Sequence, residues 1–389
     1  MDLEFTAEEC QFRAEVREWL AANMPPSPLP SMNTAEGFER HREWERLLAG
    51  ARLSAVSWPE RYGGRGATLI QWLIFEEEYW AAGAPGRVSQ NGIFLLAPTL
   101  LANGTQEQKD RFLPRIARAD DVWAQAWSEP EAGSDLASLR ATATPDGAGW
   151  RLSGQKTWSS RAAHADWCFG LFRSDPAAPR HKGLTYVLVP LDADGISVRP
   201  IAQLDGHPGF AEIFFDDVYV PPGQVLGEPG QGWELAMVTA SSERGITLRS
   251  PGRFMAAADR LLALASASCR DEAMRAQAVR AWLDADAYRL YAFAAAARLD
   301  GGEALGAQAS LMKVFWSELD LRLHELALDL LGPRAELAPG APDAAGEGSW
   351  LDGFIFALAG PIYAGTNEIQ RTIIAERVLG LPRPGRVRR

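Results

Sequence analysis

The sequence has few cysteines and histidines, and it lacks the spacings that most metal and redox sites require. The three cysteines, Cys10, Cys168 and Cys269, are odd in number and far apart, and no CxxC pair occurs in the 389 residues. The five histidines never recur three or four residues apart. These absences argue against a metal centre and a disulfide framework, and they favour a reducing compartment.

Long apolar runs and basic clusters are also scarce. No stretch of about 18 apolar residues occurs, which argues against a membrane-spanning helix. Neither a secretory signal nor an Arg-rich transit peptide is visible, so we expect a cytoplasmic protein. The net charge is −11, from 39 Lys and Arg against 50 Asp and Glu. Sequence-independent nucleic-acid binding is therefore disfavoured, because it depends on clustered cations.

The common catalytic motifs are missing as well. The sequence contains no GxxxxGK[ST] phosphate loop, no GxSxG nucleophile elbow and no HExxH helix. Gly227, Gly230 and Gly232 have the wrong spacing for a GxGxxG dinucleotide fingerprint, and they follow a strand-rich region instead of opening a βαβ unit.

Hydrophobic periodicity divides the chain into three zones, which predict domains over 1–121, 122–231 and 232–389. The first zone begins with a capping box at Thr6 and Glu9. We predict an α+β multidomain fold with an N-terminal all-α domain, a middle antiparallel β domain and a C-terminal four-helix-bundle-like domain. The expected elements are helices over 35–49, 72–79, 106–116 and 368–379, and strands over 150–152, 184–189, 196–201 and 213–220.

Five motif blocks follow one another between residues 96 and 382. Their sequences are WSEPEAGSD at 127–135, GQKTWSS at 154–160 with ADW at 165–167, EIFFDDV at 212–218, GE at 227–228 with GW at 232–233, and IYAGTNEIQR at 362–371 with ERVLG at 376–380. Together they resemble the acyl-CoA dehydrogenase family. The helix, strand, helix order of the zones agrees with the fold that this resemblance implies.

The resemblance implies FAD as cofactor, an acyl-CoA thioester as substrate and a small set of flavin contacts. The implied contacts are Trp127, Ser128, Gly133, Ser134, Trp158, Ser160, Thr366 and Glu368. The resemblance also implies that Ser134 contacts the acyl-CoA. Hydroxyls and backbone N–H groups can hydrogen-bond the flavin edge, and an indole can cover its flat face. If three of these residues have only a structural role instead, Trp158 is a core aromatic, Ser134 a helix cap and Thr366 no more than an N-cap.

The sequence departs from the family pattern at the catalytic base. Removal of an α proton requires a base and stabilisation of the carbonyl oxygen, and many members carry the base as a Glu directly before the Gly-Thr of the last motif. Here that position is Ala364. Glu243, in a Glu-Arg pair with Arg244, occupies the place used by other branches, and it is our candidate base. The alternative is a structural carboxylate paired with an Arg. The resemblance gives Arg244 and the backbone N–H of Ala364 as substrate contacts.

A second departure concerns the clamp for the flavin pyrophosphate. Residues 246–281 include Arg249, Arg253, Arg260 and Arg270, but they lack the Phe-Gly that many members carry there. The pattern looks like the actinobacterial-type branch that acts on bulky acyl-CoA thioesters such as sterol side chains. We therefore expect a homo-oligomer, dimer or tetramer, or a heteromer with a related chain, and an electron-transfer flavoprotein as the electron acceptor.

Two other functions stay open at this point. One is a flavin-dependent monooxygenase on the same fold, in which Ala364 reflects the loss of dehydrogenation. The other is a catalytically silent partner subunit that completes the flavin site of a heteromer. Glu243 disfavours both, because neither needs a base for the α proton.

Overall fold

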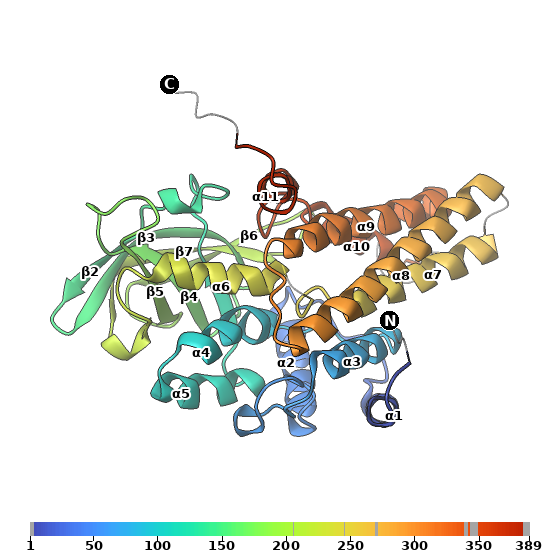
Figure 1. Cartoon of the computed structure of the whole chain (residues 1–389), viewed down its shortest axis with the longest axis horizontal. Helices are drawn as coiled ribbons and strands as arrows, with labels where there is room; N and C mark the ends of the chain where they lie inside the picture. Colours follow the sequence, from blue (N-terminus) through green and yellow to red (C-terminus); the bar gives the residue numbers. More distant parts are fainter. Residues whose placement is uncertain are drawn as a thin grey trace. The chain divides into compact units, whose positions relative to one another are not determined.

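The structure, a computed structural model, describes residues 4–204, 206–244, 246–268, 271–337, 341–342 and 349–383, with the side chains of 242–244 and 268 excepted. The chain forms two compact units. Unit 1 combines residues 1–24, 68–84 and 244–389, and unit 2 combines residues 25–67 and 85–243. The helical, strand-rich, helical order along the chain is confirmed (Figure 1). The boundaries at 121 and 231 stay a prediction.

Unit 1 is helical. Its helices are α1 (Ala7–Asn23), α3 (Leu69–Ala81), α7 (Pro251–Ser268), α8 (Glu272–Asp300), α9 (Gln308–Leu331), α10 (Ser349–Leu358) and α11 (Asn367–Ile373), with a π-helical turn at Ile374–Val378. The capping box expected at Thr6 and Glu9 begins α1. On α9, Leu319 and Leu323 are fully buried, which fits the leucine spacing of the sequence.

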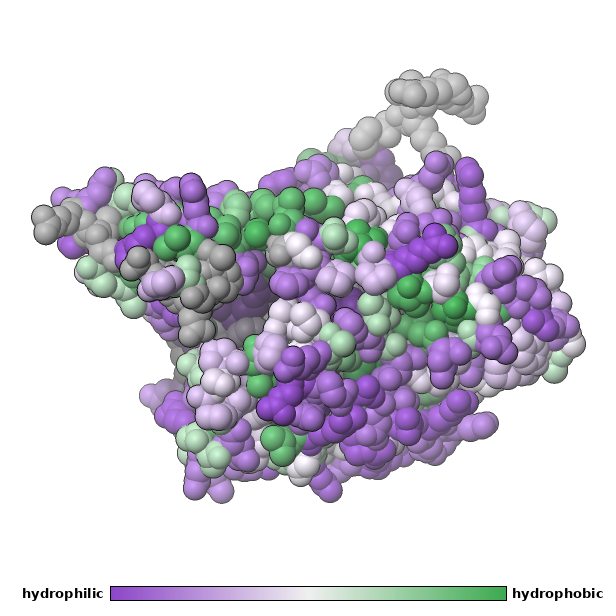
Figure 2. All heavy atoms as spheres, turned by 180° about the vertical axis from the view of Figure 1, so that it is seen from behind, coloured by the Kyte–Doolittle hydropathy of each residue, from purple (hydrophilic) through white to green (hydrophobic). Residues whose placement is uncertain are grey.

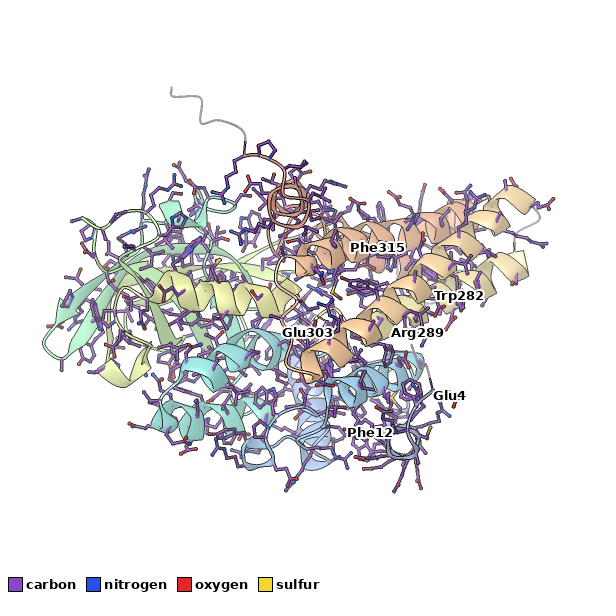
Figure 3. All side chains as sticks on the ribbon, viewed as in Figure 1. Glu4, Phe12, Trp282, Arg289, Glu303 and Phe315 are labelled. Carbon is purple, nitrogen blue, oxygen red and sulfur yellow. The ribbon has the colours of Figure 1, made fainter. Side chains whose placement is uncertain are left out.

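The N-terminal helix α3 packs with α1 and with the C-terminal helices α7 and α8 of this unit. Arg13 and Arg17 of α1 both pair with Glu78 of α3, with N–O distances of 2.8 and 2.9 Å. The backbones of α3 and α7 approach so closely that a Cβ on Gly252 would lie 2.5 Å from the carbonyl oxygen of Glu76. Glycine is therefore required at residue 252. Figure 3 shows Arg289 on α8, which forms a 3.5 Å ion pair with Glu77 of α3.

Unit 2 is built on an eight-stranded sheet. The strands are β1 (Trp123–Ala126), β2 (Thr142–Asp146), β3 (Gly149–Ser160), β4 (Trp167–Arg173), β5 (Leu184–Pro190), β6 (Ile196–Ile201), β7 (Phe210–Val220) and β8 (Val225–Leu226). Their order is β6-β7-β3-β2-β4-β5-β8, with β1 beside β4. Most pairs are antiparallel, as expected, but β1 and β2 each pair with β4 in parallel.

Helices accompany this sheet within unit 2. They are α2 (Ala35–Gly50), a π-helical segment (Asn91–Leu96), α4 (Ala97–Asn103), α5 (Gln106–Ala117) and α6 (Gly232–Arg244). Thr239 of α6 links two neighbours, because its hydroxyl lies 2.7 Å from that of Thr99 on α4 and 3.3 Å from that of Tyr186 on β5. The sequence did not predict the helical segment 91–103. The last helix also differs, since α11 ends at Ile373 and continues as a π-helical turn.

Among the described residues, no helix is long and apolar enough to span a membrane.

Candidate functional site

The loop that follows β1 carries the first motif, and a buried ion pair fixes it to β3. Lys156 Nζ lies 2.8 Å from Glu129 Oε1 and donates to the carbonyl of Trp127 over 3.2 Å. The backbone N–H of Thr157 donates to the carbonyl of Ser128 over 2.9 Å. Residues 127–129 are therefore held against residues 156 and 157 of β3.

Both charges of this pair are buried. The side chain of Lys156 is 0% exposed and that of Glu129 is 9% exposed. The carboxylate also accepts from the backbone N–H groups of Arg140 and Ala141, at 2.6 and 2.9 Å. Burial lowers the pKa of Lys156 to about 8 although Glu129 opposes the shift. The sequence analysis assigned no role to either residue. Both lie inside the quoted motif blocks, and charged residues inside strand-rich apolar surroundings are the signal that could have identified them.

Trp158 is an exposed aromatic residue, two residues beyond Lys156. Its side chain is 60% exposed, and its backbone has a φ of 60°, a left-handed conformation that is uncommon for a non-glycine residue. A shift of the β3–β7 register between Lys156 and Ser159 accompanies this conformation. The interpretation of Trp158 as a core aromatic is therefore wrong.

Three serines of the motif blocks, Ser128, Ser159 and Ser160, are half-buried or buried. Ser128 and Ser160 are half-buried, and Ser160 stands opposite Phe210 in the β3–β7 ladder. The Oγ of Ser159 is buried and has no hydrogen-bond partner among the described residues. The Nε1 of Trp127 is buried and unpartnered in the same sense. Unit 2 thus presents buried polar atoms that still need partners.

Gly133 and Ser134 lie on the exposed tip of the loop. The short 3-10 helix that follows begins after Asp135 and has no side-chain cap, so the interpretation of Ser134 as a helix cap is wrong. A Cβ on Gly133 would meet no atom within 4 Å. A larger side chain would therefore fit at residue 133, so steric crowding within the chain does not explain the glycine there.

In unit 1, the last motif forms a turn with left-handed backbone at two successive residues. The φ of Ala364 is 57° and that of Gly365 is 76°. The side-chain Nε2 of Gln370 donates to the carbonyls of both residues, over 2.9 and 3.2 Å. Gln370 itself is fully buried, so the turn has a defined shape.

Thr366 and Glu368 follow this turn at the start of α11. Thr366 is the N-cap, and its Oγ1 accepts from the backbone N–H of Ile369 over 3.3 Å. The pKa of the exposed Glu368 carboxyl is lowered by a hydrogen bond from its own backbone N–H and by one from Thr366. Thr366 therefore acts as a helix cap, which is the structural role that the sequence also allowed. A flavin contact at these two residues stays a prediction.

Glu243 and Arg244 form the last turn of α6. Their side chains lie outside the described residues, so their roles as base and substrate contact also stay predictions. At the other candidate position, Ala364 offers only a methyl group, which has no proton acceptor.

The residues of unit 2 fit a flavin. An exposed indole offers a flat face for a planar ring system, and the unpartnered Trp127 Nε1 and Ser159 Oγ are hydrogen-bonding atoms without a protein partner.

Comparisons with known proteins agree with the motifs. The family models for acyl-CoA dehydrogenase match three consecutive stretches, with the N-terminal domain at residues 6–120, the middle domain at 124–218 and the C-terminal domain at 230–379. Acyl-CoA dehydrogenase IpdE1 of Mycobacterium tuberculosis is 43% identical over 385 residues, which cover 96% of this chain and 98% of that protein.

Solved structures give the same result. A structure titled "Tcur3481-Tcur3483 steroid ACAD" has a TM-score of 0.87 at 29% identity, and the match covers 99% of this chain and 100% of that chain. The ChsE4-ChsE5 complex from Mycobacterium tuberculosis has a TM-score of 0.85 at 32% identity with the same coverage. The chain therefore belongs to the acyl-CoA dehydrogenase family, as the motifs indicated, and members of this family are FAD-dependent oxidoreductases.

Proposed function

We propose that this protein catalyses the α,β-dehydrogenation of a bulky acyl-CoA thioester to the trans-2-enoyl-CoA. The observation that carries the proposal is the exposed indole of Trp158, held in left-handed backbone beside a loop that the Lys156–Glu129 pair fixes in place. A core aromatic would be buried. An exposed one at a fixed position is suited to binding a flat ring.

FAD, when bound, supplies the acceptor for the hydride that leaves the β carbon. The residues that would hold it are those that the motifs indicate: Trp127, Ser128, Gly133, Ser134, Trp158, Ser160, Thr366 and Glu368. The indole of Trp158 excludes water from the ring that it covers. The Lys156–Glu129 pair keeps residues 127–129 at β3 and so positions the hydroxyl of Ser128.

Glu243 accepts the α proton in this proposal. This role is supported by Ala364. The other position at which family members carry the base has only a methyl group here, so it offers no carboxylate. A carboxylate that acyl chain and flavin shield from water has a raised pKa, which suits it to abstract a weakly acidic proton. The backbone N–H of Ala364, Arg244 and Ser134 would bind the thioester, and negative charge that develops on its oxygen would be stabilised by these donors.

The test is anaerobic titration of the FAD-loaded protein with acyl-CoA thioesters of short, branched, long and steroid-like acyl groups. Bleaching of the flavin absorption by a bulky thioester is the expected result. A flavin that no thioester bleaches, but that reacts with oxygen after chemical reduction to oxygenate a substrate, would point to the monooxygenase alternative and contradict the proposal.

A heteromeric assembly is a second proposal with its own support. The two solved structures above are described as pairs of differently named chains, and residues 246–281 lack the Phe-Gly segment. A related chain would then supply the pyrophosphate contacts. An electron-transfer flavoprotein as acceptor and the cytoplasm as location complete the proposal, and both stay predictions.

A further inference from the structure

Arg249 lies between α6 and α7, and two aromatic rings of unit 1 hold its guanidinium. Its Cζ is 5.2 Å from the ring centre of Trp316 on α9 and 5.0 Å from that of Tyr363. The two rings stack with their centres 6.0 Å apart. The hydroxyl of Tyr288 on α8 donates to the carbonyl of Arg249 over 2.8 Å, and Figure 3 shows Phe315 of α9, whose ring stacks on Tyr288. Backbone and guanidinium are thus both fixed.

The charge of Arg249 has no counter-charge within the part of the chain that the structure describes. Two carboxylates of α9 pair with other arginines, since Asp320 Oδ2 pairs with Arg253 at 2.8 Å and Glu318 pairs with Arg371. The Nε of Arg249 is buried and has no acceptor among the same residues. Stacking on aromatic rings stabilises a cation, but it leaves the N–H groups of the guanidinium without hydrogen bonds.

Buried polar atoms of Ser250, which follows Arg249, of Trp316, whose ring Arg249 contacts, and of Gln370 also have no partner among the described residues. They are the Oγ of Ser250, the Nε1 of Trp316 and the Oε1 of Gln370. These three residues are 2%, 0% and 0% exposed. Buried polar groups are almost always satisfied, so each exception needs an explanation, and a bound ligand is one. The atoms of Arg249, Ser250 and Trp316 can each donate a hydrogen bond, so a ligand that satisfies these three is an acceptor.

The cluster adjoins the turn that carries Ala364. Tyr363 precedes Ala364 in sequence, and Gln370 binds the carbonyl of Ala364 with its other side-chain atom. If the proposed function holds, the acyl group of the substrate passes this turn. An oxygen on that acyl group could therefore reach Arg249.

We propose that Arg249, with Ser250 and Trp316, recognises an oxygen acceptor on the acyl group, away from the thioester. The substrate class is then an acyl-CoA whose acyl part is itself oxygenated, as a carboxylate or a ketone. This inference rests on the proposed function and names the substrate class of the same site.

The experiment measures dissociation constants of the FAD-loaded enzyme by calorimetry for matched CoA thioesters. Each set contains a plain fatty acid, the oxo acid with a ketone at the penultimate carbon and the dicarboxylic acid bound through one end, at chain lengths from six to ten carbons. We expect an oxygenated member to bind about 10- to 100-fold more tightly than its plain counterpart, the range for a hydrogen bond to a charged group. Preference for the diacid identifies an anion, and equal preference for the ketone identifies a neutral acceptor.

Variants assign the effect to Arg249. Arg249→Leu should remove the preference, and Arg249→Lys should retain part of it because the charge remains. The matched control is Arg260→Leu, which removes another guanidinium stacked in the same bundle, 4.7 Å from the ring centre of Trp350, and should keep the preference. Melting temperatures verify folding, and Arg249→Gln replaces the Leu variant if that variant does not fold.

Equal affinities of plain and oxygenated thioesters at every length would overturn the inference, as would a preference that survives in the Leu and Gln variants. If plain thioesters bleach the flavin and also bind as tightly as oxygenated ones, the inference fails and the proposed function stands. If none bleaches it, the proposed function fails, and the affinities still decide whether the Arg249 cluster recognises oxygen.

Discussion

Lys156 and Glu129 form an ion pair of 2.8 Å in which the lysine side chain is completely buried. Removing one member leaves the other charge buried without its partner, which typically destabilises a protein by about 3–5 kcal/mol. We expect Lys156→Met to lower the free energy of unfolding by this amount and to reduce the FAD content of the purified protein, because residues 127–129 lose their attachment to β3.

Urea unfolding and the ratio of flavin to protein absorbance measure both effects. The double variant Lys156→Met with Glu129→Gln should recover part of the stability, since it no longer buries a lone charge. A single Lys156→Met variant as stable and as rich in flavin as the parent would rule out a positioning role for the pair.

Trp158→Ala should weaken FAD binding without unfolding the protein. The side chain is 60% exposed, so its loss costs little packing, whereas stacking on an aromatic ring contributes about 0.5–1.5 kcal/mol. We expect FAD to bind roughly 2- to 10-fold more weakly, with an altered flavin absorption band. Tyr219→Ala, which removes a 47% exposed aromatic from the neighbouring β7, is the control. An unchanged spectrum and unchanged FAD affinity would remove Trp158 from the flavin site.

Glu243→Gln should keep the fold and the flavin but lose nearly all turnover. The amide keeps the shape of the carboxyl and does not accept the proton, and loss of a positioned base costs on the order of 10²- to 10⁴-fold in rate. Stopped-flow flavin reduction measures this step directly. Glu234→Gln, which changes an exposed carboxylate in the first turn of the same helix, should react at the parental rate. Parental flavin reduction in Glu243→Gln would show that another group is the base.

Glu45 should make the protein less stable as the pH rises from about 4.5 to 7. Burial raises the pKa of this carboxyl to about 7 from a usual 4.5. The folded protein therefore binds the proton more tightly than the unfolded chain in this window, and up to about 3 kcal/mol of stability present below it is lost above it. The carboxyl accepts from the backbone N–H groups of Val88 and Ser89 and from the Ser89 hydroxyl.

Glu45→Gln can preserve these contacts, because its amide oxygen accepts from the backbone and its amide nitrogen donates to the hydroxyl. The variant should show a flatter dependence of melting temperature on pH between 5 and 7. Parallel curves for parent and variant would mean that Glu45 does not titrate in this range.

The protein should not act as a monomer. Large hydrophobic side chains are exposed in unit 1, among them Leu283 on α8 at 55%, and Ile362 and Leu379 at 66% each just outside its helices. Figure 2 shows hydrophobic side chains at the surface along these helices, and exposed apolar patches of this kind often mark interfaces. We expect a dimer or tetramer with about one FAD per chain, or a flavin-poor protein until a related chain is co-expressed.

Light scattering together with the flavin-to-protein ratio distinguishes these states. Leu283→Lys should shift the protein toward smaller species, because burying an unpaired charge opposes association. A flavin-saturated and fully active monomer would contradict both expected assemblies.

The sequence predicted the elements whose periodicity is undisturbed and missed those whose pattern is interrupted. Strand β6 has the predicted bounds, and α5 ends one residue later than expected. Strand β3 extends to Ser160, far beyond the predicted residue 152, because register shifts at Gly154 and after Lys156 break the two-residue alternation.

For the candidate site, the motifs identified the loop and Trp158 but not what fixes them. The Lys156–Glu129 pair joins residues from different segments, and the turn at Ala364 depends on a positive φ that hydrogen bonds from Gln370 hold. Neither follows from composition or spacing. Both depend on tertiary contacts, which a single sequence does not encode as a local pattern.

The contact between α3 and Gly252 also bears on the order in which the chain can fold during synthesis. Helix α3 carries Trp72, Leu73, Ile74 and Phe75, each no more than 1% exposed in the folded protein, and α7 covers part of it. Residues 85–243 leave the ribosome before α7 does. Unit 2 can therefore fold before α7 is available to cover α3. The apolar side chains of α3 are then exposed to solvent, and exposed apolar surface promotes aggregation or chaperone binding.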